Sequence, residues 1–259
     1  MIAKILNSKQ QEVEAAKRQL PFGELKARVA HHEATRSFRQ AIAQPGKLSL
    51  IAELKRKSPS KGMLRERFDP VSLAQTLQGA GASALSVLTD EPYFGGHVDF
   101  LRDVQQFTEI PVLRKDFLID EYQLYQSAFY GADAVLLIAR VLSQTQLRDY
   151  VQTAEAVGVE PLVEIHAEAE IERALACGAD MIGINTRDLD TFQMQPQLVQ
   201  QLLPRIPRDK TIIAESGLQT AEEVVQLKHL GVQAVLIGEA LMTAPDAAAK
   251  VRELFHRVW

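Results

Sequence analysis

Residues 131–138 read GADAVLLI, and three similar phrases occur at 81–88 (GASALSVL), 178–185 (GADMIGIN) and 231–238 (GVQAVLIG). Each phrase follows an amphipathic stretch, begins with a glycine and continues as an apolar run rich in β-forming residues. Glycine is favoured where a helix ends in a residue with left-handed backbone angles. Each phrase therefore predicts the end of a helix followed directly by a buried strand.

The phrases begin roughly 50 residues apart, which is too far for a single strand and helix per repeat. Four further strand-like runs alternate with them, at 48–55 (LSLIAELK), 111–117 (PVLRKDF), 161–166 (PLVEIH) and 211–217 (TIIAESG). Each repeat interval therefore holds two strands, and the sequence predicts eight strands in all.

Amphipathic segments with apolar residues at helical spacing follow each predicted strand. They lie at 71–80, 98–107, 121–132, 146–158, 168–179, 197–206, 221–231 and 246–257. Strict alternation of strands and helices indicates right-handed βαβ units and a parallel sheet. Eight units in a chain of 259 residues most simply close into a (β/α)8 TIM barrel. The alternative is a doubly wound open sheet, which binds ligands at one crevice instead of around a ring.

The predicted barrel occupies residues 48–259, and no stretch within it resembles an interdomain linker. Residues 1–47 lie outside the barrel pattern and contain helical periodicity at 2–20 and 23–43. We expect them to form an N-terminal helical extension that packs on the barrel, so that the chain is a single domain overall.

The composition excludes several classes of function. The net charge is −4 without a clustered basic surface, which argues against nucleic-acid binding. The longest apolar run, 134–139, is too short to span a membrane, and the first residues lack the apolar core of a signal peptide. The single cysteine, Cys177, excludes an intramolecular disulfide and suits a reducing compartment. We therefore expect a cytoplasmic protein, and no group of residues has the spacing of a metal site.

Polar residues gather where the predicted strands end. The functional face of a (β/α)8 barrel lies at the carboxyl ends of its strands. Side chains alternate along a strand, so Glu53 and Lys55 share one face, as do Glu164 and His166. His166 is interpreted as a loop or capping residue. The rim residues that predict a pocket are Glu53, Lys55, Lys115, Glu164, Asn185, Arg187 and Glu215.

Glycines end the last two predicted strands, at Gly217 and Gly238. Barrels of this kind often bind phosphate at these two loops through backbone N–H groups that only glycine lets a ligand approach closely. Glycines that merely form turns would give the same pattern. We expect the substrate to be a phosphorylated small molecule.

Eight motifs together resemble the indole-3-glycerol-phosphate synthase family of tryptophan biosynthesis. The resemblance covers essentially the whole chain, including the helical extension. The motifs, in order, are IAELKRKSPSKG (51–62), SVLTD (86–90), FGG (94–96), VLRKDF (112–117), PLVEIH (161–166), GINTRDL (183–189), IAESG (213–217) and IGEALM (237–242).

The resemblance implies a lyase that needs no cofactor. The family closes the ring of 1-(2-carboxyphenylamino)-1-deoxyribulose 5-phosphate, with loss of carbon dioxide and water. Lys115 matches the general acid that protonates the substrate ketone oxygen, and Glu164 matches the general base. Lys55 matches a second lysine, and Glu53 is expected to pair with a lysine and orient it. Which lysine serves which protonation step is left open.

The remaining matches concern substrate binding. Asn185 and Glu215 match residues that bind substrate hydroxyls, and Arg187 supports either a loop or the substrate carboxylate. Many family members carry a serine in place of Glu239, so its carboxylate is expected to point away from the phosphate and leave only its backbone N–H. The phosphate end is expected at Ser58, Ser216, Gly217, Gly238 and Glu239, and the anthranilate ring at Phe94, Phe117 and Leu136.

Three other interpretations compete with this one. Phosphoribosylanthranilate isomerase, a related barrel, would need a cysteine where Lys55 stands and an aspartate near Asn185. A class I aldolase would use Lys115 or Lys55 to form a Schiff base. A barrel that has lost catalysis would not need to keep two lysines together with Glu164. We expect an active enzyme that acts as a monomer.

Overall fold

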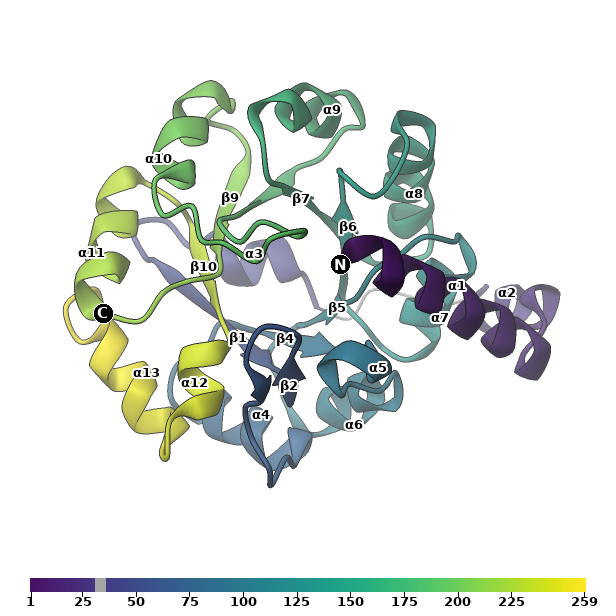
Figure 1. Ribbon diagram of the computed structural model, residues 1–259, viewed down its shortest axis with the longest axis horizontal. Helices are drawn as coiled ribbons and strands as arrows, with labels where there is room; N and C mark the ends of the chain where they lie inside the picture. Colours follow the sequence, from purple (N-terminus) through teal and green to yellow (C-terminus); the bar gives the residue numbers. More distant parts are fainter. Residues whose placement is uncertain (31–35) are drawn as a thin grey trace.

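The computed structural model describes residues 1–30 and 36–259. Eight parallel strands form a closed barrel (Figure 1). The ring order is β1-β10-β9-β8-β7-β6-β5-β4, and β1 closes it by pairing with both β10 and β4. The strands are β1 (Ser49–Leu54), β4 (Ala84–Leu88), β5 (Val112–Lys115), β6 (Ala134–Ile138), β7 (Glu160–Ile165), β8 (Met181–Asn185), β9 (Thr211–Glu215) and β10 (Ala234–Ile237). The predicted (β/α)8 barrel is confirmed, and the open-sheet alternative is wrong.

Helices follow each strand and form the outer layer of the barrel. They are α4 (Pro70–Gly79), α6 (Asp99–Phe107), α7 (Tyr122–Phe129), α8 (Gln144–Ala156), α9 (Ile171–Ala176), α10 (Leu198–Leu202), α11 (Ala221–Leu230) and α13 (Ala247–Phe255), with short 3-10 turns η1 (Glu168–Glu170) and η2 (Leu203–Arg205). Four short elements were not predicted: the hairpin β2 (Lys57–Ser58) and β3 (Gly62–Met63), and the helices α5 (Glu91–Phe94) and α12 (Glu239–Thr243). No helix of the described residues is long and apolar enough to cross a membrane.

The glycines that open the four repeat phrases have the backbone angles expected of them. Gly81, Gly131, Gly178 and Gly231 have φ angles of 105°, 80°, 86° and 89°. An L-residue with a side chain rarely adopts these angles, so glycine ends each helix at low cost. The chain then enters the next strand at once.

Both faces of the barrel strands are buried, as is usual for parallel sheets covered by helices. One set of side chains fills the barrel interior, and the alternate set packs against the outer helices. The interior is therefore a solid core, and only the carboxyl ends of the strands are free to line a pocket. The main interior side chains are Ile51, Leu113, Leu136, Leu162, Ile213 and Leu236.

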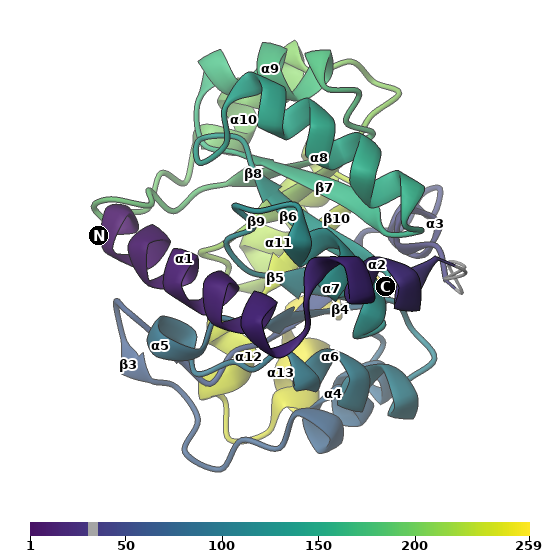
Figure 2. The same ribbon diagram turned by 90° about the vertical axis from the view of Figure 1, so that its right-hand side faces the viewer.

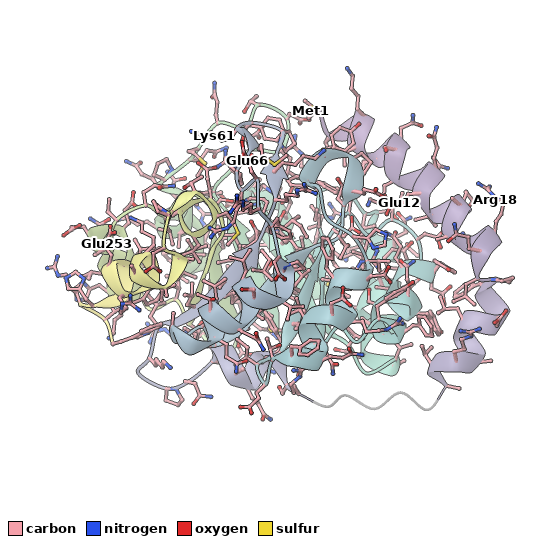
Figure 3. All side chains as sticks on the ribbon, turned by 90° about the horizontal axis from the view of Figure 1, so that it is seen from below. Met1, Glu12, Arg18, Lys61, Glu66 and Glu253 are labelled. Carbon is pink, nitrogen blue, oxygen red and sulfur yellow. The ribbon has the colours of Figure 1, made fainter. Side chains whose placement is uncertain are left out.

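The N-terminal extension covers both ends of the barrel. Helix α1 (Ile2–Gln19) begins over the carboxyl ends of the strands and runs down the side of the barrel, and α2 (Phe22–Val29) packs beside α7 (Figures 2 and 3). Helix α3 (Phe38–Ile42) lies at the opposite end, where Phe38 and Ile42 join the side chains of the barrel interior. The helical pattern expected at 23–43 therefore belongs to two helices, and its residues 31–35 lie outside the described part of the chain.

Candidate active site

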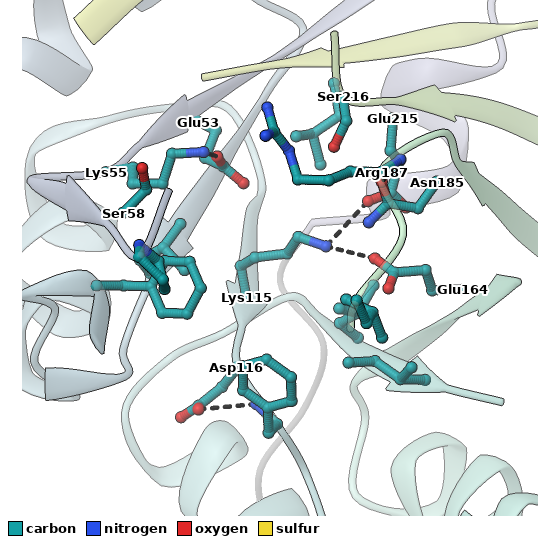
Figure 4. A pocket seen from close by; sticks show the side chains of 18 of the residues that line it. Glu53, Lys55, Ser58, Lys115, Asp116, Glu164, Asn185, Arg187, Glu215 and Ser216 are labelled. Carbon is teal, nitrogen blue, oxygen red and sulfur yellow. Dashed lines mark hydrogen bonds and ion pairs between the residues drawn. The ribbon is translucent and has the colours of Figure 1, made fainter. Parts of the chain in front are cut away.

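A pocket opens where the barrel strands end (Figure 4), and the first turns of α1 contribute to its lining. All the predicted site residues line it except Gly217 and Gly238, which are the sequence neighbours of the lining residues Ser216 and Glu239. The lining comes from all eight barrel strands and several of the loops that follow them, so closure of the barrel brings together residues that are far apart in sequence. The predicted residues that line the pocket are Glu53, Lys55, Ser58, Phe94, Lys115, Phe117, Leu136, Glu164, Asn185, Arg187, Glu215, Ser216 and Glu239.

Lys115 is the centre of the polar part of the pocket. It is the last residue of β5, and its Nζ lies 2.6 Å from Glu164 Oε2 and 2.9 Å from Glu215 Oε2. Burial by itself lowers the pKa of Lys115, but the carboxylates of Glu164, Glu215 and Glu53 outweigh it and raise the pKa above its usual value. Lys115 is therefore a stable ammonium that can donate hydrogen bonds into the pocket (Figure 4).

The two carboxyl groups beside Lys115 have different tendencies to ionise. Burial raises the pKa of both. For Glu164, the charges of Lys115 and His166 reverse this effect and hold the pKa below its usual value. For Glu215, the neighbouring Glu164 charge adds to burial and holds the pKa above its usual value. Glu164 therefore ionises more readily than Glu215, and acid–base sites use such a difference to place two roles side by side.

A second ion pair lies on β1. Lys55 Nζ is 2.6 Å from Glu53 Oε1, and Glu53 is almost fully buried. The alternation of side chains along the strand places both on the pocket side, as the sequence predicts. The pairing expected for Glu53 is therefore present, and its partner in this structure is Lys55 and not Lys115.

Two glycines make room for the buried carboxylates. A Cβ atom at Gly183 would collide with Glu215 Oε1, and a Cβ at Gly238 would collide with Glu53 Oε1. Sequence reasoning missed Gly183 and assigned Gly238 only to phosphate binding. The signal that could have revealed them is a glycine in or next to a strand core, which often marks a close approach of another group.

The predicted phosphate end has an unusual backbone. Ser216 has a φ of 70° and Gly217 a φ of 83°, so the chain turns sharply after β9. The described structure assigns no intramolecular hydrogen bond to the N–H groups of these two residues. Nearby, Glu239 Oε2 lies 3.3 Å from Arg187 Nη2, and Glu239 Oε1 lies 3.8 Å from Lys61 Nζ. The Glu239 carboxylate thus faces the pocket cations, and the expectation that it points away is wrong.

Apolar residues form the opposite wall. The rings of Phe94 and Phe117 lie with centroids 6.3 Å apart, near Leu136. Ile2 and Ile5 of α1 complete this wall, and sequence reasoning did not assign them to the site. Nothing in the sequence of α1 says which end of the barrel it covers, because an apolar helix face packs equally well on either end. Sequence reasoning also missed Leu189 and Phe192, two residues of the loop after β8 that line the pocket.

A buried ion cluster fastens α1 beside the pocket. Lys9 is fully buried, and its Nζ lies 2.8 Å from Asp116 Oδ1 and 3.2 Å from Asp90 Oδ2. Asp116 directly follows Lys115 and also pairs with Arg114 at 3.0 Å. Asp90 accepts hydrogen bonds from backbone N–H groups of α5, the helix that carries Phe94. One ammonium therefore joins α1 to two walls of the pocket.

His166 does not line the pocket. Its Nε2 lies 3.3 Å from Glu164 Oε1, on the far side of that carboxylate, and its backbone N–H donates to Glu170 at 2.6 Å. This agrees with its interpretation as a loop residue. Within residues 1–30 and 36–259, no cluster of histidine, cysteine and acidic side chains is arranged to hold a metal ion.

Comparison with solved structures agrees with the barrel fold described above. Among solved structures, 3-hexulose-6-phosphate synthase from Salmonella typhimurium has a TM-score of 0.64 at 17% identity, covering 81% of this chain and 97% of that chain. N-acetylmannosamine-6-phosphate 2-epimerase from Clostridium perfringens has a TM-score of 0.63 at 15% identity, covering 85% and 96%. At such identities the likeness shows only the shared barrel fold.

The sequence comparisons identify the family. Proteins named indole-3-glycerol phosphate synthase are 41% identical in Alkaliphilus metalliredigens (98% of this chain, 97% of the relative) and 44% identical in Caldanaerobacter subterraneus (100% and 98%). A third, from Chlorobium luteolum, is 45% identical over 98% of both chains. The family model described as "Indole-3-glycerol phosphate synthase" matches residues 2–254. The chain therefore belongs to the indole-3-glycerol phosphate synthase family, the carboxy-lyases that form indole-3-glycerol phosphate in tryptophan biosynthesis.

Proposed function

We propose that Lys115, Glu164 and Glu215 form the acid–base centre of this synthase, which converts 1-(2-carboxyphenylamino)-1-deoxyribulose 5-phosphate to indole-3-glycerol phosphate. The observation that carries the proposal is one ammonium held 2.6 and 2.9 Å from two buried carboxyl groups with opposite tendencies to ionise. An ammonium, a carboxylate and a carboxylic acid at one point supply the proton donors and acceptor that ring closure and dehydration require.

In the ring-closing step, an aromatic carbon attacks the substrate ketone and its oxygen becomes an alkoxide. Lys115 donates a proton to this oxygen. An alkoxide is a strong base, so an ammonium with a raised pKa still transfers its proton as the charge develops. Carbon dioxide then leaves, and its electron pair restores the aromatic ring, so the protein needs no cofactor as an electron sink.

In the dehydration step, Glu164 removes the ring proton and the hydroxyl leaves as water. Lys55, held by Glu53 at 2.6 Å, is the proton donor for this leaving group. Glu215 keeps its own proton and holds Lys115 between the two carboxyl groups. Separate lysines for the two steps explain why two lysine–carboxylate pairs face one pocket.

Binding residues hold the substrate in the folded shape that ring closure needs. The phosphate is bound by Ser58, by the free N–H groups at Ser216 and Gly217, and by Gly238 and Glu239 through the backbone. The anthranilate ring lies between Phe94, Phe117 and Leu136, and Asn185 binds a substrate hydroxyl. Arg187 lies beside the phosphate end, where it contacts Glu239. Orientation of this kind supplies up to about 7–11 kcal/mol of the barrier reduction.

The competing Schiff-base chemistry of a class I aldolase fits this pocket poorly. A lysine attacks a carbonyl only as the neutral amine. The two carboxyl groups beside Lys115 raise its pKa and favour the ammonium instead. Borohydride added with substrate is therefore expected to trap no covalent adduct on Lys115.

The proposal is tested by fluorescence detection of indole-3-glycerol phosphate. Lys115→Met and Glu164→Gln are each expected to reduce kcat by at least about 10²–10⁴-fold, because each removes a proton-transfer group. Lys17→Met, which removes a lysine of α1 far from the polar centre, serves as the matched control. Near-wild-type turnover of Lys115→Met, with a native circular dichroism spectrum, contradicts the acid assignment.

We also propose that the enzyme acts as a monomer in the cytoplasm, without a nucleic-acid partner. The net charge of −4 argues against a nucleic-acid partner, and the single buried cysteine suits the reducing cytoplasm. Light scattering on the purified protein tests the oligomeric state, and a dimer mass contradicts it.

A further inference from the structure

The Glu239 carboxylate occupies an unexpected place at the pocket mouth. Its two oxygens face two cations, Arg187 at 3.3 Å and Lys61 at 3.8 Å. Glu239 follows the end of β10, Arg187 follows the end of β8, and Lys61 lies in the turn of the β2–β3 hairpin. Three separate loops therefore meet at one acidic side chain.

These cations have no other acidic partner among the described residues. Within residues 1–30 and 36–259, the only side chain that accepts a hydrogen bond from the Arg187 guanidinium is Glu239, and Lys61 has no second ion pair. All three side chains remain partly exposed, so they can exchange partners without breaking the protein core. The Glu239 carboxylate thus holds the position that an incoming anion would need.

A phosphate group and the Glu239 carboxylate cannot both bind these cations closely, because like charges at such distances repel. We infer that Glu239 is an internal counter-anion, which pairs with Arg187 and Lys61 in the empty enzyme and is displaced when a phosphate group binds. Phosphate binding is then an exchange of one anion for another. This inference rests on the phosphate end proposed above and concerns how that end is occupied before substrate arrives.

The exchange weakens phosphate binding relative to a pocket with free cations. Removing the Glu239 charge is expected to free both cations and to remove a repulsion, so phosphate binds more tightly. Two partly exposed ion pairs and one repulsion correspond to an affinity gain of about 3- to 30-fold. By the same reasoning, Glu239 assists release of the phosphorylated product.

The experiment measures the inhibition constant of inorganic phosphate in competition with the substrate. Glu239→Gln is expected to lower this constant by about 3- to 30-fold relative to wild type. Glu91→Gln, which removes an exposed carboxylate from α5 on the same face of the barrel, is the charge-matched control and is expected to leave it unchanged. An inhibition constant for Glu239→Gln equal to or above the wild-type value overturns the inference.

A second variant tests whether Glu239 acts through its cations. In an Arg187→Met background, Glu239→Gln is expected to have a smaller effect, because one of the two cations is already gone. An undiminished effect in that background overturns the exchange mechanism. If phosphate fails to compete even in wild type, the proposed phosphate end is wrong and this inference falls with it. If phosphate competes but Glu239→Gln leaves the constant unchanged, only the inference is wrong.

Discussion

Lys9→Met is expected to destabilise the protein far more than any other lysine substitution on α1. Lys9 Nζ lies fully buried between Asp116 and Asp90, at 2.8 and 3.2 Å. Methionine keeps the apolar stem of the side chain and removes only the charge. The variant therefore isolates the contribution of one buried ammonium to the attachment of the helix.

The magnitude follows from which carboxylates lose their partner. Lys9 also pairs with Glu12 at 2.9 Å, but the Glu12 side chain is partly exposed and water can replace its partner. Asp116 keeps its pair with Arg114 at 3.0 Å, whereas Asp90 Oδ2 has no other partner among the described residues. Removal of one partner from a buried ion pair costs about 3–5 kcal/mol. Because Asp116 remains partly compensated, we expect a loss near the lower end, about 3 kcal/mol of unfolding free energy.

The loss depends on pH in a defined direction. Burial alone would raise the pKa of Asp116, but Lys9 and Arg114 lower it below its ordinary value of 3.8. A carboxylate with a lowered pKa stabilises the fold above that ordinary value, and this stabilisation is lost as the pH falls through the folded-state pKa. The difference between wild type and Lys9→Met is therefore largest near neutral pH and narrows below about pH 4.

Urea unfolding monitored by circular dichroism measures the effect at pH 7 and at about pH 3, below the ordinary pKa of an aspartate. The control is Lys17→Met, which removes a partly exposed lysine of the same helix paired with Asp120 at 2.7 Å. Such pairs contribute about 0–1 kcal/mol. Equal losses for the two variants, or a Lys9→Met loss that grows as the pH falls, refute the reasoning.

Two further variants address the pocket. Gly183→Ala places a methyl group against Glu215 Oε1, so we expect kcat to fall while the circular dichroism spectrum stays native. The control is Gly23→Ala, because a methyl group added at Gly23 meets no other atom. An unchanged kcat for Gly183→Ala contradicts the need for close packing between Gly183 and Glu215. Phe94→Leu removes the ring that faces Phe117 at 6.3 Å, and steady-state kinetics should give a raised KM with a smaller change in kcat. A loss confined to kcat would contradict the binding role of Phe94.

The barrel could be predicted because parallel strands covered by helices are buried on both faces. Such strands read as continuous apolar runs, as in the segment 134–139, and a glycine with positive φ marks the helix end before β4, β6, β8 and β10. Helix boundaries were less predictable. The pattern at 197–206 contains Pro204, which lacks an N–H, and the α-helix ends at Leu202 before a 3-10 turn.

The rim residues could be predicted from their position after apolar strands, but their partners could not. Sequence alone does not say that Lys115 pairs with Glu164 and Glu215 while Lys55 pairs with Glu53. These choices depend on the stagger of neighbouring strands, which pairs Asn185 with Glu215 across β8 and β9. Local patterns do not encode that stagger, because it is fixed only when the whole ring closes.

The extension that covers both ends of the barrel has a consequence for synthesis of the chain on the ribosome. Helices α1 and α3 are made first, yet their partners come much later: Lys9 waits for Asp116, and Arg39 at the other end contacts Asp180. Contacts between such distant residues slow folding, because a long loop must close before they form. In the growing chain, α1 and α3 therefore lack these partners until most of the barrel strands have been synthesised. The complete pocket is among the last features to form.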